Sequence, residues 1–127
     1  MIEICDTRLA DWKAAGLNAM IADNGFQGGL IMGPGLPLAA APDLAALEVT
    51  LSVEGAIKGR GTGRLVLGHP LDSFAWLAGE LARRGQVLRG GDIVAAGTCT
   101  GLHFVTAPAE IVADFGKLGR VEMNVVA

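Results

Sequence analysis

A short loop of glycine and threonine, Gly97-Thr98-Cys99-Thr100-Gly101, carries the side chains best suited to bind a small acid. Glycine lets the backbone approach a ligand closely, and the threonine hydroxyls can hold a carboxylate or keto oxygen. A polar Gly-Gly-Asp turn and a short apolar run precede this loop, so we expect a strand over residues 92–96 that ends at it. Thr98 and Thr100 are therefore candidate substrate-binding residues.

The histidines and cysteines do not indicate nucleophilic catalysis. Neither His69 nor His103 stands in a Ser-His-Asp order, so hydrolysis through an activated serine has no support. We expect His69 to cap or pack at the start of a helix, whereas an active-site role for His103 stays open because it follows the threonine loop. Cys99 has no basic neighbour in sequence and is predicted to be buried and inert, and Cys5 is predicted to lie in the core.

Hydrophobic periodicity and turn residues predict the elements that must position these groups. Alternating apolar residues indicate strands, and Pro70 followed by Gly85 frames a helix. Gly59, Gly61 and Gly63 lack the spacing of a dinucleotide-binding motif and favour a closely packed strand. Strands are expected over residues 1–5, 30–32, 45–53, 56–67, 92–96, 110–115 and 120–126, and helices from Asp6 or Thr7 to about Ala22 and over residues 70–84.

This order of elements predicts an α+β fold with largely antiparallel pairing. Strands outnumber the two helices, and the hairpin around the Glu54-Gly55 turn joins neighbouring antiparallel strands. A length of 127 residues fits one domain, which we place over residues 1–127.

Five blocks that span nearly the whole chain resemble the 2-keto-4-pentenoate hydratase and 2-oxohepta-3-ene-1,7-dioate hydratase branch of the fumarylacetoacetate hydrolase superfamily. They occur in the order of that branch and at about its spacing. The blocks are Glu3 to Lys13, Ala22-Asp23-Asn24, Leu67 to Leu77, Leu88 to Gly101 and Ala113 to Val121. The resemblance implies a mixed β-sandwich roll and covers the C-terminal half of the family fold, with the N-terminal half absent.

The resemblance also implies a divalent metal site, for Mg²⁺ or Mn²⁺, to which this chain contributes Glu3. In the family, three carboxylates hold the metal, and Glu3 matches the third of them. The other two belong to a Glu-x-Glu pair that lies upstream, and only two residues precede Glu3 here. We therefore expect metal binding to depend on carboxylates from outside these residues.

A second group of candidate substrate-binding residues follows the first predicted helix. Asp23 and Asn24 match the Ala-Asp-Asn segment that lines the active site in this branch, and Gln27 lies just beyond. An equally good interpretation of Asp23 and Asn24 is an ordinary turn that ends a helix. Phe26 and Gln27 depart from the small or hydroxyl residues usual in the branch, as does Ala19-Met20 from its Asp-Thr, so the pocket could be bulkier or more apolar.

The expected reaction is hydration of a 2-hydroxy-2,4-dienoate (2-keto-4-pentenoate) to a 4-hydroxy-2-oxo acid, by a hydro-lyase of aromatic catabolism. Decarboxylation of a 2-oxo-dioate of the 4-oxalocrotonate type is the sister possibility within the family. The rival from another class is a truncated or split, non-catalytic partner that lacks the metal site. The substrate in the first two cases is a small 2-oxo or 2-hydroxydienoic acid.

Composition excludes several other classes of protein. The net charge of −3 and the scattered basic residues argue against nucleic-acid binding. No apolar run is long enough to cross a membrane, and two cysteines without a signal peptide predict a cytoplasmic protein. Hydrophobic residues make up 51% of the chain. Either abundant alanine and valine or a surface made for a partner explains this, the partner being a second copy in a homo-oligomer or a complementary N-terminal half.

Overall fold

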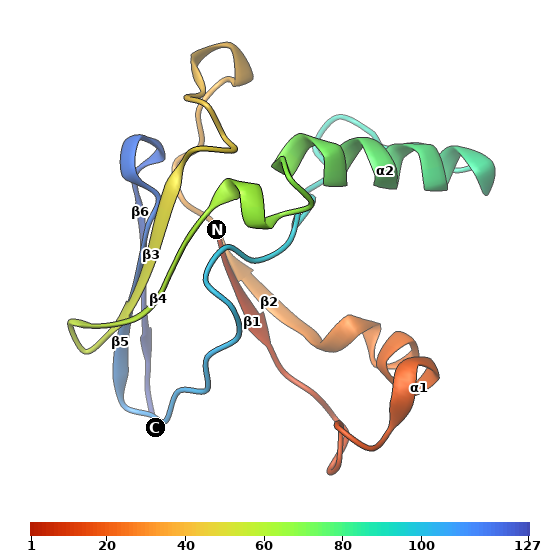
Figure 1. Cartoon of the computed structure of the whole chain (residues 1–127). Coiled ribbons are helices and arrows are strands. Elements are labelled where there is room, and N and C mark those ends of the chain that lie inside the picture. Colours follow the sequence, from red (N-terminus) through yellow and green to blue (C-terminus); the bar gives the residue numbers. More distant parts are fainter. The chain divides into compact units, whose positions relative to one another are not determined.

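A computed structural model describes all residues, 1–127. The chain forms two compact units. Unit 1 comprises Met1–Gly33 and unit 2 comprises Pro34–Ala127. Figure 1 shows the elements of both, and each unit is described by itself below. The placement of a single domain over residues 1–127 stays a prediction.

Unit 1 is built on a two-stranded antiparallel sheet. Strand β1 (Ile2–Cys5) pairs with β2 (Gln27–Ile31), so that Glu3 lies opposite Leu30. The link between the strands contains helix α1 (Gly16–Ala22). Glu3 on β1 and Gln27, the first residue of β2, therefore belong to the same small sheet.

Helix α1 is much shorter than predicted, and the prediction that it begins at Asp6 or Thr7 is wrong. Gly16 has a φ of +77°, a left-handed conformation that a helix cannot pass through. Further upstream, Thr7 and Arg8 use their polar groups on the side chain of Asp23. The apolar residues do recur at helical spacing. The contacts with Asp23 and the conformation of Gly16 nevertheless leave only about the last two turns of the predicted helix.

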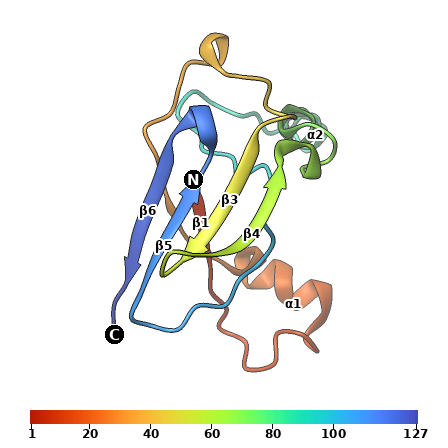
Figure 2. The same ribbon diagram turned by 60° about the vertical axis from the view of Figure 1, so that its left-hand side comes forward.

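Unit 2 is built on a four-stranded antiparallel sheet with the order β4-β3-β5-β6 (Figure 2). The strands are β3 (Glu48–Val53), β4 (Ala56–Thr62), β5 (Ala109–Asp114) and β6 (Arg120–Val125). Five of the seven buried apolar residues lie on its strands, namely Val49, Ala109, Ile111, Ala113 and Val121, and the other two are Ala45 and Val66. Because β5 pairs on both sides, its alternating residues form the centre of this core.

Strand β4 ends five residues earlier than the predicted arm. A 3-10 helix, Gly63–Leu65, follows it, and Gly63 is buried against the backbone carbonyl of Leu44. Its amide donates to the carbonyl of Leu47, 3.0 Å away. The backbone at Leu44 occupies the space beside Gly63, so β4 ends at Thr62.

Helix α2 (Pro70–Arg83) confirms the predicted second helix. The ring nitrogen Nδ1 of His69 accepts a hydrogen bond from the amide of Leu71, 3.1 Å away, which confirms the capping role. In the last turn Glu80 forms ion pairs with Arg83 and Arg84. Residues three and four positions apart are neighbours on a helix surface, so the opposite charges of these pairs stabilise the last turn.

Residues 92–96 do not form a strand, so that prediction is wrong. The Asp92 carboxylate accepts from the amide of Arg89 and closes a turn at 2.7 Å, as expected for this aspartate. At the other end, the Ser73 hydroxyl of α2 donates to the carbonyl of Ala96 at 2.8 Å. Side chains form hydrogen bonds with these two backbone groups, and residues 92–96 pair with no strand.

The predicted α+β class with two helices and antiparallel sheets is confirmed. None of the helices combines the length and the apolar character that a membrane crossing requires. Several apolar side chains of α2 are exposed, among them Phe74 and Trp76. A homo-oligomer or a complementary half that covers them stays a prediction.

Candidate functional site

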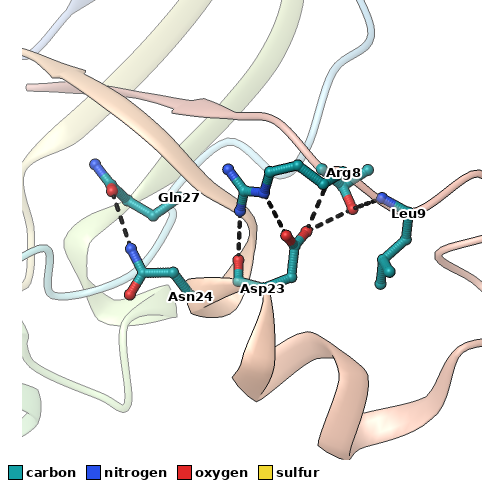
Figure 3. Close-up of polar contacts among 6 residues, drawn as sticks. Arg8, Leu9, Asp23, Asn24 and Gln27 are labelled. Carbon is teal, nitrogen blue, oxygen red and sulfur yellow. Dashed lines mark hydrogen bonds and ion pairs between the residues drawn. The ribbon is translucent and has the colours of Figure 1, made fainter.

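Asp23 is the buried polar centre of unit 1, with a relative exposure of 8%. Figure 3 shows its contacts with Arg8. Its carboxylate accepts a hydrogen bond from the Thr7 hydroxyl at 2.7 Å and one from the amide of Arg8 at 3.2 Å. The Arg8 guanidinium donates through Nε to the same carboxylate and through a terminal nitrogen to the Asp23 carbonyl, 2.7 Å away. The carboxylate therefore joins the segment after β1 to the end of α1.

These donors also set the charge state of Asp23. The hydrogen bonds from Thr7 and Arg8 stabilise the carboxylate and lower the pKa of Asp23 against the opposing effect of burial. The group is ionised at neutral pH and is already surrounded by donors. In this arrangement its carboxylate holds the fold of unit 1 together, and its part in substrate binding stays a prediction.

Asn24 and Gln27 lie together on the turn that follows Asp23. The amide nitrogen of Asn24 donates to the side-chain oxygen of Gln27 at 3.4 Å. Asn24, Gly25 and Phe26 all have φ values between +54° and +65°, in the left-handed region. Asn24 is exposed and Gln27 is half-buried, so the turn presents amide donors and acceptors at the surface of unit 1.

Glu3 is exposed on β1, and its charge acts on the thiol of Cys5, two residues further along the strand. Partial burial raises the pKa of the Cys5 thiol, and the Glu3 carboxylate raises it further. Cys5 itself is exposed, so its predicted place in the core is wrong. The two-stranded sheet is too small to bury both of its faces.

The donor set of this chain does not match the metal that the resemblance implies. Nowhere in residues 1–127 do three or more His, Cys, Asp or Glu side chains gather so that they could hold a metal ion. Magnesium is bound by oxygen ligands in near-octahedral geometry, and Glu3 supplies one carboxylate. These residues alone do not fit a metal site.

We predict that the isolated chain does not bind Mg²⁺ or Mn²⁺ in a saturable manner. The ion loses bound water only reluctantly, and one exposed carboxylate does not compensate for that loss. Isothermal titration calorimetry of the chain and of Glu3→Gln should give the same, non-saturating heats. One-to-one binding that Glu3→Gln abolishes would contradict the prediction and would mean that further ligands assemble in solution.

The threonine loop lies in unit 2 and is organised by Thr98. The Thr98 hydroxyl donates to the carbonyl of Gly101 at 3.3 Å and accepts from the amides of Thr100 and Gly101 at 3.3 and 3.0 Å. A hydroxyl has one proton and two lone pairs, so these bonds use all of its capacity. The Thr100 side chain is half-buried and has no hydrogen-bond partner within the chain, which leaves its hydroxyl available to a ligand.

Two further polar residues lie at this loop. The ring nitrogen Nε2 of His103 donates to the carbonyl of Thr100 at 2.7 Å, which places the proton on that nitrogen. Cys99 is half-buried, and burial raises the pKa of its thiol, in keeping with the predicted unreactive cysteine. The His103 side chain thus supports the loop by binding the backbone carbonyl of Thr100.

The structure groups the candidates by unit. Asp23, Asn24, Gln27 and Glu3 belong to unit 1, and the threonine loop belongs to unit 2. Sequence reasoning missed Arg8, the main partner of Asp23. A salt bridge between residues fifteen positions apart leaves no periodic signal, although both residues lie in the blocks that carry the family resemblance.

Comparison with known proteins matches this chain to one family. The model of the fumarylacetoacetate (FAA) hydrolase C-terminal domain matches residues 3–126. A 2-keto-4-pentenoate hydratase of Paraburkholderia phymatum is 37% identical over 97% of this chain and 47% of its own length. A 4-oxalocrotonate decarboxylase of Pseudomonas putida is 32% identical over 98% of this chain and 47% of its own length.

Solved structures agree with the sequence matches. The 4-oxalocrotonate decarboxylase of Pseudomonas putida G7, complexed with magnesium and adipate, superposes with a TM-score of 0.84 at 31% identity, over 94% of this chain and 45% of the decarboxylase. The same enzyme complexed with calcium and acetate gives a TM-score of 0.83. The chain thus spans a little under half the length of these relatives.

The family model covers nearly every residue, the identities exceed 30%, and the α+β fold superposes on a family structure. The chain therefore belongs to the fumarylacetoacetate hydrolase family, whose C-terminal domain it matches.

Proposed function

We propose that this chain is the C-terminal part of a hydro-lyase that adds water to a 2-hydroxy-2,4-dienoate and yields a 4-hydroxy-2-oxo acid. The observation that carries the proposal is the 37% identity to a 2-keto-4-pentenoate hydratase over 97% of the chain. Such acids carry a carboxylate beside a 2-oxo or 2-hydroxy oxygen, and they need several hydrogen-bond donors. An acid of this class is the proposed substrate, and the cytoplasm is the proposed location.

Two groups of residues would contact the substrate in this proposal. Thr98 preorganises the loop by accepting from the amides of Thr100 and Gly101, and the Thr100 hydroxyl, which has no partner within the chain, would donate to an acid oxygen. Asn24 and Gln27 contribute amide groups from the unit 1 turn, and Asp23 holds that turn in place. Glu3 would become one ligand of Mg²⁺ or Mn²⁺ once further carboxylates are supplied from outside these residues.

Joining the chain to the preceding segment of the Paraburkholderia phymatum hydratase tests the proposal. We expect the fused protein to consume 2-hydroxypenta-2,4-dienoate with Mg²⁺, followed as loss of dienol absorbance, while the isolated chain does not. Thr100→Val should lower kcat/KM of the fused protein by about tenfold or more, because one hydrogen bond to a charged group contributes about 1.5–3 kcal/mol. Thr106→Val, an exposed threonine outside the loop, serves as the matched control.

A folded fused protein without hydratase activity would contradict the proposal. If it instead released carbon dioxide from 4-oxalocrotonate, the decarboxylase alternative would hold, which the TM-score of 0.84 to that enzyme supports. Inactivity on both acids would favour the non-catalytic alternative, in keeping with the absence of a metal-binding cluster in this chain.

A further inference from the structure

Gly59 and Gly61 on strand β4 remain unexplained by the proposed reaction, although the sequence repeats glycine here at every second position. Residues two apart on a strand point to the same face. Gly61 lies opposite Val49 and Gly59 lies opposite Leu51 on β3. Because Val49 is 4% exposed, the two glycines belong to the core face of the sheet.

The backbone of the threonine loop occupies the space that side chains on this face would need. A Cβ atom added to Gly59 would lie 2.6 Å from the carbonyl oxygen of Thr100 and 2.7 Å from Nε2 of His103. A Cβ added to Gly61 would overlap the carbonyl of Cys99 even more closely. Separations under 3.0 Å are essentially never seen for real Cβ atoms, so any side chain here displaces the loop or the strand.

The loop is also attached at its other end. The Ser73 hydroxyl holds the carbonyl of Ala96, and Gly97, with a φ of +136°, packs on the buried side chain of Val66. The contacts at Ala96 and Gly97 fix where the loop begins. The two strand glycines fix how closely its far end approaches the sheet.

We propose that Gly59 and Gly61 are positioning residues, which set the depth at which the Thr98–Gly101 loop lies on β4 and so where the Thr100 hydroxyl is presented. The role of the loop in binding an acid rests on the function proposed above. The positioning itself rests on the backbone contacts alone. Strand glycines commonly mark places where another backbone approaches closely.

The thiol of Cys99 reports on this position without any substrate. Cys5→Ser leaves Cys99 as the one remaining cysteine. In this background we expect Gly61→Ala and Gly59→Ala to raise the rate of Cys99 alkylation by iodoacetamide about tenfold, because a displaced loop exposes the thiol and lowers its raised pKa. The amide NMR signals of residues 98–101 should shift in the same variants.

Gly29→Ala is the matched control. Gly29 also lies in a strand, β2, but its added Cβ would make an ordinary contact of 3.7 Å with Ile4. Its alkylation rate should equal that of the background. If Gly61→Ala does not fold, Gly59→Ala, with the milder overlap, gives the same test. Folded variants with unchanged Cys99 reactivity and unchanged loop signals would overturn the proposal, because β4 would then be the element that moves.

The fused enzyme adds a readout that separates positioning from a general loss of stability. There, Gly59→Ala should raise KM by about tenfold while kcat changes less, since the loop contacts substrate in the ground state as well. Equal changes in kcat and KM relative to Gly29→Ala would contradict the positioning role. If the fused protein without further substitutions is inactive, the proposed function is contradicted. The alkylation of Cys99 then tests the positioning role by itself.

Discussion

Ile111→Ala should destabilise unit 2 more than any other single apolar truncation on the sheet. Ile111 is 7% exposed on β5, the strand that pairs with β3 on one side and β6 on the other. Removing three carbons from a buried isoleucine costs about 2–5 kcal/mol, through lost transfer energy and the cavity that remains. This is a large share of the stability of a domain of this size, which is about 5–15 kcal/mol.

Urea denaturation followed by far-UV circular dichroism measures the effect, with Ile57→Ala as its control. Ile57 is also a strand isoleucine, but it is 50% exposed on the edge strand β4, so its truncation should cost less than half as much. Similar midpoints for the two variants would show that Ile111 is not at the centre of the core.

Asp23→Asn should destabilise unit 1 at neutral pH, and the effect should fade in acid. The substitution keeps the shape of the side chain but replaces a carboxylate that accepts from Thr7 and twice from Arg8. Since the folded protein lowers the pKa of Asp23, its contribution to stability is fully present above the ordinary aspartate pKa of about 3.9. That contribution is lost as the pH falls through the lowered, folded-state pKa.

Free energies of unfolding of the chain and of Asp23→Asn, measured at pH 7 and again near pH 3, test this prediction. The difference between the two proteins should shrink at the lower pH. Asp114→Asn is the control, because Asp114 pairs with Arg120 at 2.7 Å in the same Nε-to-carboxylate manner but is more exposed. Solvent screening makes such exposed pairs weak, so we expect a smaller loss. A difference for Asp23→Asn that is the same at both pH values would exclude the ion pair as its cause.

The Asp23 network also shows how the family resemblance and the structure complement each other. The resemblance selected Asp23, Asn24 and Gln27 as one group, and the structure does place them on one turn. It divides their roles, however, because the Asp23 carboxylate is used by Thr7 and Arg8 while Asn24 stays exposed. The contribution of each to substrate binding stays a prediction.

Local pattern was sufficient where the sequence has one strong period and clear ends. Helix α2 begins at Pro70 and ends just before Gly85, and strands β3, β5 and β6 follow their alternating residues. Apolar alternation determines a strand face through side-chain geometry alone, and proline and glycine determine helix ends through backbone sterics. The α+β class and the antiparallel pairing were therefore determined by the sequence itself.

Only the tertiary structure decided the elements whose backbone groups find partners far along the chain. Residues 92–96 resemble a strand, yet they pair with no other strand, and the Ser73 hydroxyl donates to the carbonyl of Ala96. The predicted first helix is reduced to α1 because Thr7 and Arg8 bind Asp23. A local pattern states which conformations suit a segment, but long-range hydrogen bonds and close backbone packing, as at Gly61, select among them.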